Sequence, residues 1–397
     1  MKKLKLFKTL LTPSLGVLTL GTIAAVATSC GCAPEPTPVV DVREYVGITA
    51  NANSTLTFVH HYVGVFPDLQ YSTDGTSWNT YSEEISISQG QTLLLKGNNP
   101  EGWSHSSSTY SHLSISGNVS ISGNVMGLLD NGATSGEEGD ITAIPCDYCF
   151  YNLFNAASGI TSVSKNFLSA TGLADSCYKY MFNSCSSLTA APELPVTTLA
   201  SNCYFGMFVG CTSLTHAPEL RATTLADTCY YAMFQNCTSL TVAPKLPATV
   251  LEKECYDGMF LNCISLTIAP DLPATSLANS CYWSMFNGCT SLTQAPKLLP
   301  AAGLANFCYN YMFSGCTSLT QAPELPATSL AESCYNYMFN GCTSLNSIKI
   351  GYTGNYKAMY FNGWVKNVAS SGILYYNGSD RTTGTSAIPS GWTVQPF

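Results

Sequence analysis

The sequence predicts an α/β repeat solenoid, leucine-rich-repeat-like with short parallel strands and short helices, preceded by a small all-β sandwich-like domain. Three observations predict this fold class. A pair of cysteines recurs every 26 residues, helix-starting and helix-ending residues flank each pair, and alternating apolar residues precede the first pair. A fixed period of this size is typical of stacked units that cannot bury an apolar face alone.

The repeat is defined by two series of cysteines. The first members are Cys177, Cys203, Cys229, Cys255, Cys281, Cys308 and Cys334. The second members are Cys185, Cys211, Cys237, Cys263, Cys289, Cys316 and Cys342. The step is 26 residues except for one step of 27, where Leu299 is inserted. We predict that the solenoid covers residues 141–350.

Each segment between the two cysteines of a pair is predicted to be a helix of about two turns. Ser, Asn or Thr precedes most first cysteines, as expected of a helix N-cap, and Gly or Asn precedes most second cysteines, as expected of a helix end. Cys177 and Met181, four residues apart, would share one buried face. The following TxAPxL segment is predicted to be a short parallel strand, with a rise of about 4.8 Å per copy.

The prolines of these segments limit the predicted strands to two or three paired residues, because proline cannot donate to a ladder. Residues 41–135 contain short stretches of alternating or clustered apolar residues, and they predict the sandwich-like domain. Residues 351–397 lack cysteine and are predicted to be a C-terminal cap.

The N-terminus predicts export. Four lysines within eight residues precede an apolar stretch, Leu10 to Val26, and the sequence Ala-Thr-Ser-Cys at 27–30. Small residues before a cysteine resemble the lipobox of bacterial lipoproteins, which implies a signal peptide over 1–29 and a lipid on Cys30. Residues 30–40 would then be a proline-rich tether. An uncleaved membrane helix is the alternative, because the stretch is nearly long enough to span a bilayer.

The charge of the chain argues against nucleic acid as a partner. Loss of the four leader lysines would change the formal net charge from −8 to −12, and only 10% of the residues are charged. Nucleic acid binding requires a basic field that this chain lacks. Its polarity comes from Ser, Thr, Asn and Tyr, which suits neutral surfaces such as glycans or other proteins.

The repeated cysteines are interpreted as buried packing residues, because free cysteine behaves as a small hydrophobe. Disulfides remain open, since an exported protein meets an oxidising compartment. Zinc is disfavoured because the repeats contain one histidine, His216. Cys146-Asp-Tyr-Cys149 has CxxC spacing and is interpreted as the start of the repeat region, with a redox or disulfide role as the alternative.

The recurring MFxGCTSL, followed by LPAT at a period near 26, resembles the BspA-like leucine-rich-repeat surface proteins of bacteria. The resemblance covers about residues 145–350. It implies a solenoid with a stacked parallel sheet, secretion, and a surface role in adhesion or host contact. The chain departs from the commoner pattern in placing Pro inside the strand segment and Cys where Ile or Val is frequent.

The residue two places after each first cysteine is expected to face solvent. This column contains Lys179, Phe205, Tyr231, Asp257, Trp283, Asn310 and Asn336. Exposed aromatic residues suit contact with sugars or protein surfaces, so Phe205, Tyr231 and Trp283 are the candidate partner-binding residues. A second candidate row contains Ala190, His216, Val242, Ile268, Gln294 and Gln321.

These features predict a lipid-anchored protein on the extracellular face of the cell membrane that binds host or environmental macromolecules, such as a host protein or a glycan. A passive surface coat or antigen with variable repeat number is the alternative. We predict no enzyme activity, cofactor or metal, because the sequence shows no Ser/His/Asp grouping, metal motif or phosphate-binding loop.

Overall fold

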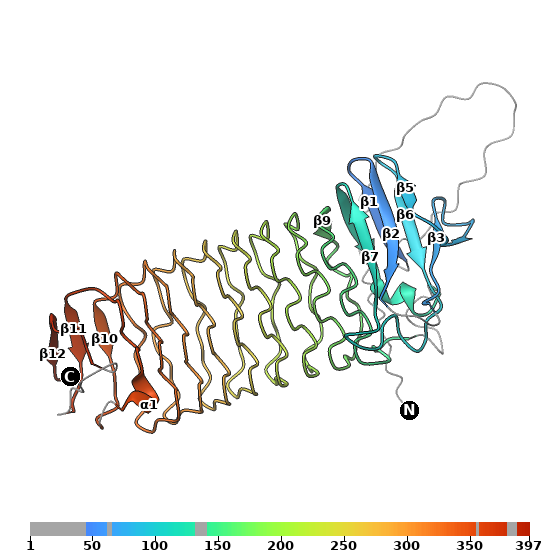
Figure 1. Cartoon of the computed structure of the whole chain (residues 1–397). Helices are drawn as coiled ribbons and strands as arrows, with labels where there is room; N and C mark the ends of the chain where they lie inside the picture. The colour runs from blue at the N-terminus through green and yellow to red at the C-terminus, as the bar shows by residue number, and fades with distance from the viewer. Residues whose placement is uncertain (1–44, 62–65, 132–140, 355–356, 379–386) are drawn as a thin grey trace, which may run out of the picture. The chain divides into compact units, whose positions relative to one another are not determined.

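The computed structural model describes residues 45–61, 66–131, 141–354, 357–378 and 387–397 (Figure 1). These residues all belong to one contact unit of the chain, 40–397. Cys30, its predicted lipid and the predicted signal peptide and tether lie outside the described residues.

The first described segments form two sheets. The larger has the order β4-β3-β6-β1-β8-β9 and the smaller the order β5-β2-β7. The strands of the larger sheet are β4 (Asn79–Thr80), β3 (Gln70–Ser72), β6 (Thr92–Lys96), β1 (Val46–Ala50), β8 (Val119–Gly123) and β9 (Ile160–Val163). Those of the smaller are β5 (Ile85–Ile87), β2 (Ser54–His60) and β7 (Ser111–Ser116).

Buried apolar residues alternate with more exposed residues along these strands, and the buried ones form the core of this region. In β2, Leu56 and Phe58 are buried, while Thr55 and Thr57, which precede them in the chain, are more exposed. In the larger sheet, Ile48 of β1 pairs with Leu93 on one side and Ile121 on the other, and all three are buried. Successive side chains of a strand point to opposite faces, so each sheet contributes one apolar face to the same buried cluster.

The larger sheet continues directly into the repeat region. Its last strand, β9, pairs in parallel with β8 and belongs to the first coil of the repeats. Two more backbone hydrogen bonds join the regions: the Leu113 amide donates to the Leu153 carbonyl at 2.8 Å, and the Val125 amide donates to the Phe167 carbonyl at 3.0 Å. Val125 begins the 3-10 helix η1 (Val125–Leu128), which Asn124 caps with its side chain.

The predicted α/β solenoid is wrong, because the segments between paired cysteines are not helices. Figure 1 shows the coils between β9 and β10 (Ser347–Lys349) as irregular loops. Helical structure in the described residues is confined to η1 and α1 (Ala358–Phe361), each four residues long. The structure is built mainly from strands, turns and isolated bridges, and the repeats form no continuous solenoid sheet.

The hydrogen bonds of these segments explain why no helix forms. Between Cys177 and Cys185, every second amide bonds to the next coil, as Tyr178 does to the Cys203 carbonyl at 3.0 Å. The amides between them close local turns three residues back, as Met181 does to the Tyr178 carbonyl at 3.2 Å. An α-helix would direct all these amides four residues back along the same segment. The coils are therefore joined by backbone bonds that a helix would have used internally.

This path requires a left-handed residue every fourth position. In the first repeat these residues are Ser176, Tyr180 and Ser184, with φ of 57°, 57° and 60°. The Ser, Asn and Gly residues interpreted as helix caps lie at the first and third positions, because they tolerate this conformation better than most residues do. These Ser, Asn and Gly residues therefore mark successive left-handed turns of the backbone, and not the ends of helices.

At the second of these three left-handed positions, we expect that replacing glycine by alanine lowers the unfolding free energy and that replacing alanine by glycine does not. Gly258 occupies it with φ of 59°, and a Cβ there would meet no atom closer than 4.0 Å, so Gly258→Ala should lose about 1 kcal/mol of unfolding free energy through backbone strain alone. Ala232, with φ of 50°, occupies the same place one coil earlier, and Ala232→Gly should be neutral or stabilising. Urea unfolding of both variants tests the sign, and equal losses would contradict it.

Side chains stack in columns inside the coils. Tyr204, Tyr230 and Tyr256 lie in one column with ring centroids 5.9 Å apart, and the Phe column next to it repeats at 5.4–5.8 Å. Rings in both columns are nearly parallel, so each ring fills the space between its neighbours. These separations exceed the rise of about 4.8 Å that strand pairing would impose.

The TxAPxL segments pair only in part. Bridges on this face join His216 to Val242 and Ile268 to Gln294, while no bridge joins Val242 to Ile268. On the following face the pairing is staggered, since Thr198 bridges Thr224 and Val250 bridges Ser276. On these two faces most coils therefore bridge only one neighbour, whereas near the end of the repeats Leu298 also bridges Glu324 across the seam that the first pattern leaves open. The predicted continuous parallel strands are replaced by these isolated bridges.

The last described residues pair in parallel. β10 pairs with β11 (Gly372–Tyr375), and β11 pairs with β12 (Trp392–Gln395). Their buried residues include Ile348, Leu374 and Trp392, which join the same apolar cluster as the last repeats. In the described residues, no helix has the length and apolarity needed to cross a membrane.

Candidate binding surfaces

The predicted partner-binding residues lie in one row along successive coils. We define the aromatic row as Lys179, Phe205, Tyr231, Asp257 and Trp283, each two places after the first cysteine of its coil. All five side chains are half-buried, whereas the sequence suggested a fully solvent-facing column. Each of the five is followed directly by a residue in the left-handed conformation.

The structure brings Phe205 and Tyr231 together. Their ring centroids are 4.4 Å apart with an interplanar angle of 12°, so the two rings form one stacked platform. The Lys179 ammonium lies 3.9 Å from the Phe205 ring centroid on the side of the preceding coil. A cation over an aromatic face is attracted by the ring quadrupole, by about 0.5–1 kcal/mol at a partly exposed site.

Trp283 is separated from this platform by a full coil. Asp257 occupies the row position between Tyr231 and Trp283, so the aromatic residues are not contiguous. The Trp283 ring stacks instead on Phe307, with centroids 5.7 Å apart and an interplanar angle of 14°. The row therefore consists of two aromatic platforms with a carboxyl group between them.

The column identified from the sequence contains Asp257, but the sequence did not indicate a role for the Asp257 side chain. Within the described residues its carboxylate has neither a hydrogen-bond donor nor an ion-pair partner; the nearby Lys253 pairs with Glu254 at 3.2 Å. Burial, and to a smaller extent the negative charge of Glu254, raises the pKa of Asp257 to about 7. At neutral pH the side chain is therefore about half protonated, and it can accept a hydrogen bond from a ligand or donate one to it.

The raised pKa predicts that acid stabilises this part of the protein. The folded-state value of about 7 exceeds the unfolded value of 3.8, so the stabilising proton is fully bound below pH 4 and is lost as pH rises to about 7. We expect Asp257→Asn to raise the unfolding free energy at pH 8 by about 1–2 kcal/mol, after allowance for partial exposure, and to leave it nearly unchanged at pH 4. Urea unfolding at both values measures this, and a gain of equal size at pH 4 would contradict it.

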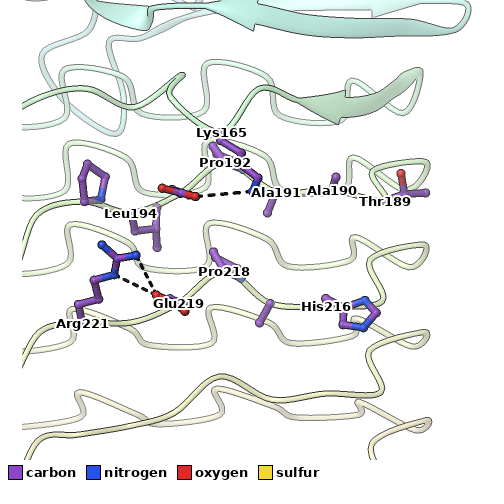
Figure 2. A pocket seen from close by; sticks show the side chains of 13 residues that line it. Lys165, Thr189, Ala190, Ala191, Pro192, Leu194, His216, Pro218, Glu219 and Arg221 are labelled. Atoms are coloured by element: carbon purple, nitrogen blue, oxygen red, sulfur yellow. Dashed lines mark hydrogen bonds and ion pairs between the residues drawn. The ribbon is translucent and has the colours of Figure 1, made fainter. Parts of the chain in front are cut away.

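A second surface is the groove at an unpaired seam. We define the seam groove as the space of about 480 Å³ between residues 189–195 of one coil and 216–221 of the next. Figure 2 shows Thr189, Ala190 and Pro192 on one side and His216, Pro218 and Arg221 on the other. No bridge joins Ala190 to His216, because each pairs with its other neighbour, Ser162 and Val242 respectively.

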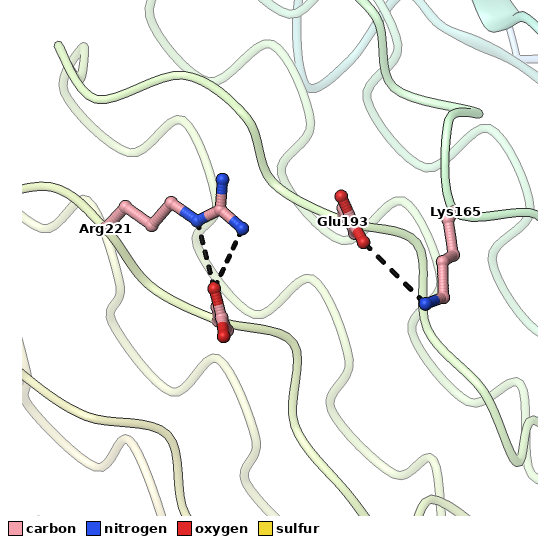
Figure 3. A network of polar contacts seen from close by, with 4 residues as sticks. Lys165, Glu193 and Arg221 are labelled. Carbon is pink, nitrogen blue, oxygen red and sulfur yellow. Dashed lines mark hydrogen bonds and ion pairs between the residues drawn. The ribbon is translucent and has the colours of Figure 1, made fainter. Parts of the chain in front are cut away.

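The charges around the seam groove neutralise one another (Figure 3). Arg221 donates from Nε and Nη2 to one Glu219 oxygen at 3.0 and 2.8 Å, and the Lys165 ammonium lies 4.0 Å from Glu193. All four side chains are more than half exposed, so each pair contributes only about 0–1 kcal/mol. The groove therefore presents no net charge that would select an ionic ligand.

The repeat cysteines are free and deeply buried. Each second cysteine donates its thiol to the carbonyl of a Phe in the preceding coil, as Cys237 does to Phe208 at 3.1 Å. Burial raises the pKa of Cys177, Cys229 and Cys281 to about 12, so these thiols stay protonated and unreactive at neutral pH. In the described part of the chain, no three His, Cys, Asp or Glu side chains are grouped as metal ligands.

No family model, curated protein or solved structure matches this chain.

Proposed function

We propose that the protein is a non-catalytic, lipid-anchored cell-surface protein that binds a host or environmental macromolecule through the aromatic row. The observation that carries the proposal is the alternation of flat aromatic faces with an unpaired acceptor: the Phe205–Tyr231 platform, Asp257, and then Trp283. A sugar chain offers the matching surface, because each ring has an apolar face that stacks on aromatic residues and hydroxyls that donate to a carboxylate.

The repeat spacing favours an extended ligand. Successive row positions belong to neighbouring coils, whose stacked core rings repeat at 5.4–6.0 Å. A chain lying across several coils would meet the two platforms and Asp257 at different points along its length. Many weak contacts of this kind add to useful affinity when they are linked in one ligand.

Anchoring through Cys30 rests on the sequence of the leader. Membrane fractionation of cells that express the Cys30→Ser variant tests it, and the variant should leave the membrane fraction. Retention of that variant in the membrane would favour the uncleaved helix.

Binding is tested with the purified chain on a panel of soluble polysaccharides by titration calorimetry. For any polysaccharide bound, the combined change of Phe205, Tyr231 and Trp283 to Ala should weaken binding at least tenfold. The matched control changes Val242 and Ile268 to Ala, because these exposed side chains lie on the second candidate row. No binding by the intact chain would favour a passive coat, and a loss confined to the control variant would move the site to the second row.

A further inference from the structure

One cysteine differs from all the others that the structure describes. Of the sixteen described cysteines, fifteen are buried and Cys146 alone is partly exposed. It lies three residues before Cys149 in the sequence Cys-Asp-Tyr-Cys. Cys149 is fully buried and begins the column of first cysteines, since the Phe150 amide after it bonds to the Cys177 carbonyl at 2.9 Å.

The surroundings of Cys146 hold its sulfur beside a second thiol and a histidine. The buried Cys149 thiol interacts with the Cys146 sulfur and lowers the pKa of Cys146, whereas burial and the carboxylates of Asp147 and Glu101 act in the opposite direction. The Cys146 thiol donates a hydrogen bond to the Ser104 carbonyl at 3.4 Å, and its sulfur lies 4.0 Å from His105 Nδ1. Burial raises the pKa of Cys149, so the exposed member of the pair is the one that ionises first.

The backbone around the pair is fitted to this arrangement. The Ser104 amide donates to the Cys149 carbonyl at 2.9 Å, which fixes the loop carrying His105 against the first coil. A Cβ on Gly102 would lie only 2.2 Å from the Cys146 sulfur, and Gly102 has φ of 115°. Only glycine leaves space for the sulfur at this place. Two loops distant in sequence therefore meet at the thiol pair.

We propose that Cys146 and Cys149 form a thiol–disulfide exchange site that reacts with low-molecular-weight disulfides. Cys146 is the attacking residue, because it is the partly exposed cysteine of the pair and the His105 imidazole beside its sulfur can take its proton. Cys149 is the resolving residue, because it is the second cysteine of the CxxC segment and its thiol interacts with the Cys146 sulfur. This inference does not depend on the proposed binding function.

The exchange proceeds in two balanced steps. The Cys146 thiolate attacks one sulfur of a disulfide RSSR, forming a mixed disulfide and releasing one thiol, RSH, with the proton that Cys146 lost. Cys149 then attacks the Cys146 sulfur, closing the Cys146–Cys149 disulfide and releasing a second RSH with the Cys149 proton. The protein pair is oxidised by two electrons and RSSR is reduced to two RSH. The CxxC spacing, with two residues between the cysteines, is typical of pairs that form such a disulfide.

The repeat thiols provide an internal contrast. Cys177 is buried in the next coil of the same column, and burial raises the pKa of its thiol to about 12. It has no solvent-facing sulfur and so should react only after unfolding. Oxidation would therefore add one covalent link at the start of the repeats while leaving the stacked core unchanged.

The full chain, reduced and then freed of reductant, is incubated at pH 8 with hydroxyethyl disulfide and analysed by peptide mass spectrometry. We expect a Cys146–Cys149 disulfide to form at least tenfold faster than any modification of the repeat cysteines. Peptide mapping separates these residues from Cys30 and Cys32. Modification of the repeat cysteines at the same rate, or recovery of both thiols unmodified, would overturn the proposal.

Two matched variants assign the roles. Cys149→Ser should accumulate the hydroxyethyl mixed disulfide on Cys146, because no resolving thiol remains, while Cys146→Ser should leave Cys149 unmodified. Circular dichroism shows whether each variant is folded. If either variant is unfolded, the wild-type time course still tests the proposal. A folded Cys149→Ser protein without the mixed disulfide would rule out Cys146 as the attacking residue.

Discussion

Replacing Phe234 by Ala should lower the free energy of unfolding by about 3–5 kcal/mol. The Phe234 ring is fully buried and stacks between Phe208 and Phe260, with centroids 5.7 Å away on each side. Its removal loses the transfer energy of the ring and leaves a cavity that two fixed neighbours cannot fill. Urea unfolding of the variant measures the loss.

The same change should loosen neighbouring coils first. The Phe234 amide donates to the Met259 carbonyl, and its own carbonyl accepts the Cys263 thiol, at 2.9 and 3.1 Å. In a stack that coheres through nearest neighbours, hydrogen exchange should therefore accelerate in the coils beside Phe234 before distant ones. The control is Val242→Ala in the same coil, a side chain 54% exposed, which should cost less than about 0.5 kcal/mol. Similar losses for both variants would contradict the stacking argument.

Replacing Tyr256 by Phe should stabilise the protein by about 1–3 kcal/mol. The Tyr256 hydroxyl is buried and has no hydrogen-bond partner among the residues that the structure describes, although the ring itself stacks on Tyr230 and Tyr282 at 5.9 and 5.8 Å. Phe would keep the stacked ring and remove a polar group whose loss of water contacts is uncompensated. Thermal unfolding monitored by circular dichroism measures the gain.

Tyr337→Phe provides the control of opposite sign. The Tyr337 hydroxyl accepts a hydrogen bond from Asn362 Nδ2 at 3.1 Å, so its removal should cost about 0.5–1.5 kcal/mol. Stabilisation by both changes would show that loss of any hydroxyl in these columns is favourable. Destabilisation by Tyr256→Phe would show that its hydroxyl has a compensating contact.

The periodic columns could be read from the sequence because stacking repeats the same environment at each step. The buried Cys, Tyr, Met and Phe of every copy occupy equivalent places, and the aromatic row runs along equivalent outer places. A period identifies equivalent positions without specifying the backbone between them. For this reason the column that contains Phe205, Tyr231 and Trp283 was found, while the unpaired carboxylate of Asp257 within it was overlooked.

The helices were predicted wrongly because the residues that flank the paired cysteines are compatible with two different backbone conformations. Ser176 and Ser184 suit helix ends, but they suit left-handed turns equally well, and Cys177 and Met181 can share a face in either path. The backbone path is set by the acceptor of the Tyr178 amide, which is the carbonyl of a residue 25 positions later in the chain. A single copy contains no information about that partner.

By itself, the sequence determined the period, the buried columns and the row of outer residues, since these follow from side-chain chemistry repeated along the chain. Tertiary structure decided the backbone path, the alternate pairing of coils and the meeting of Cys146 with Ser104 and His105. Each of these depends on contacts between segments far apart in sequence, whose relative positions are set only when the coils stack. The physical reason is that a backbone amide bonds to whichever acceptor packing brings within reach.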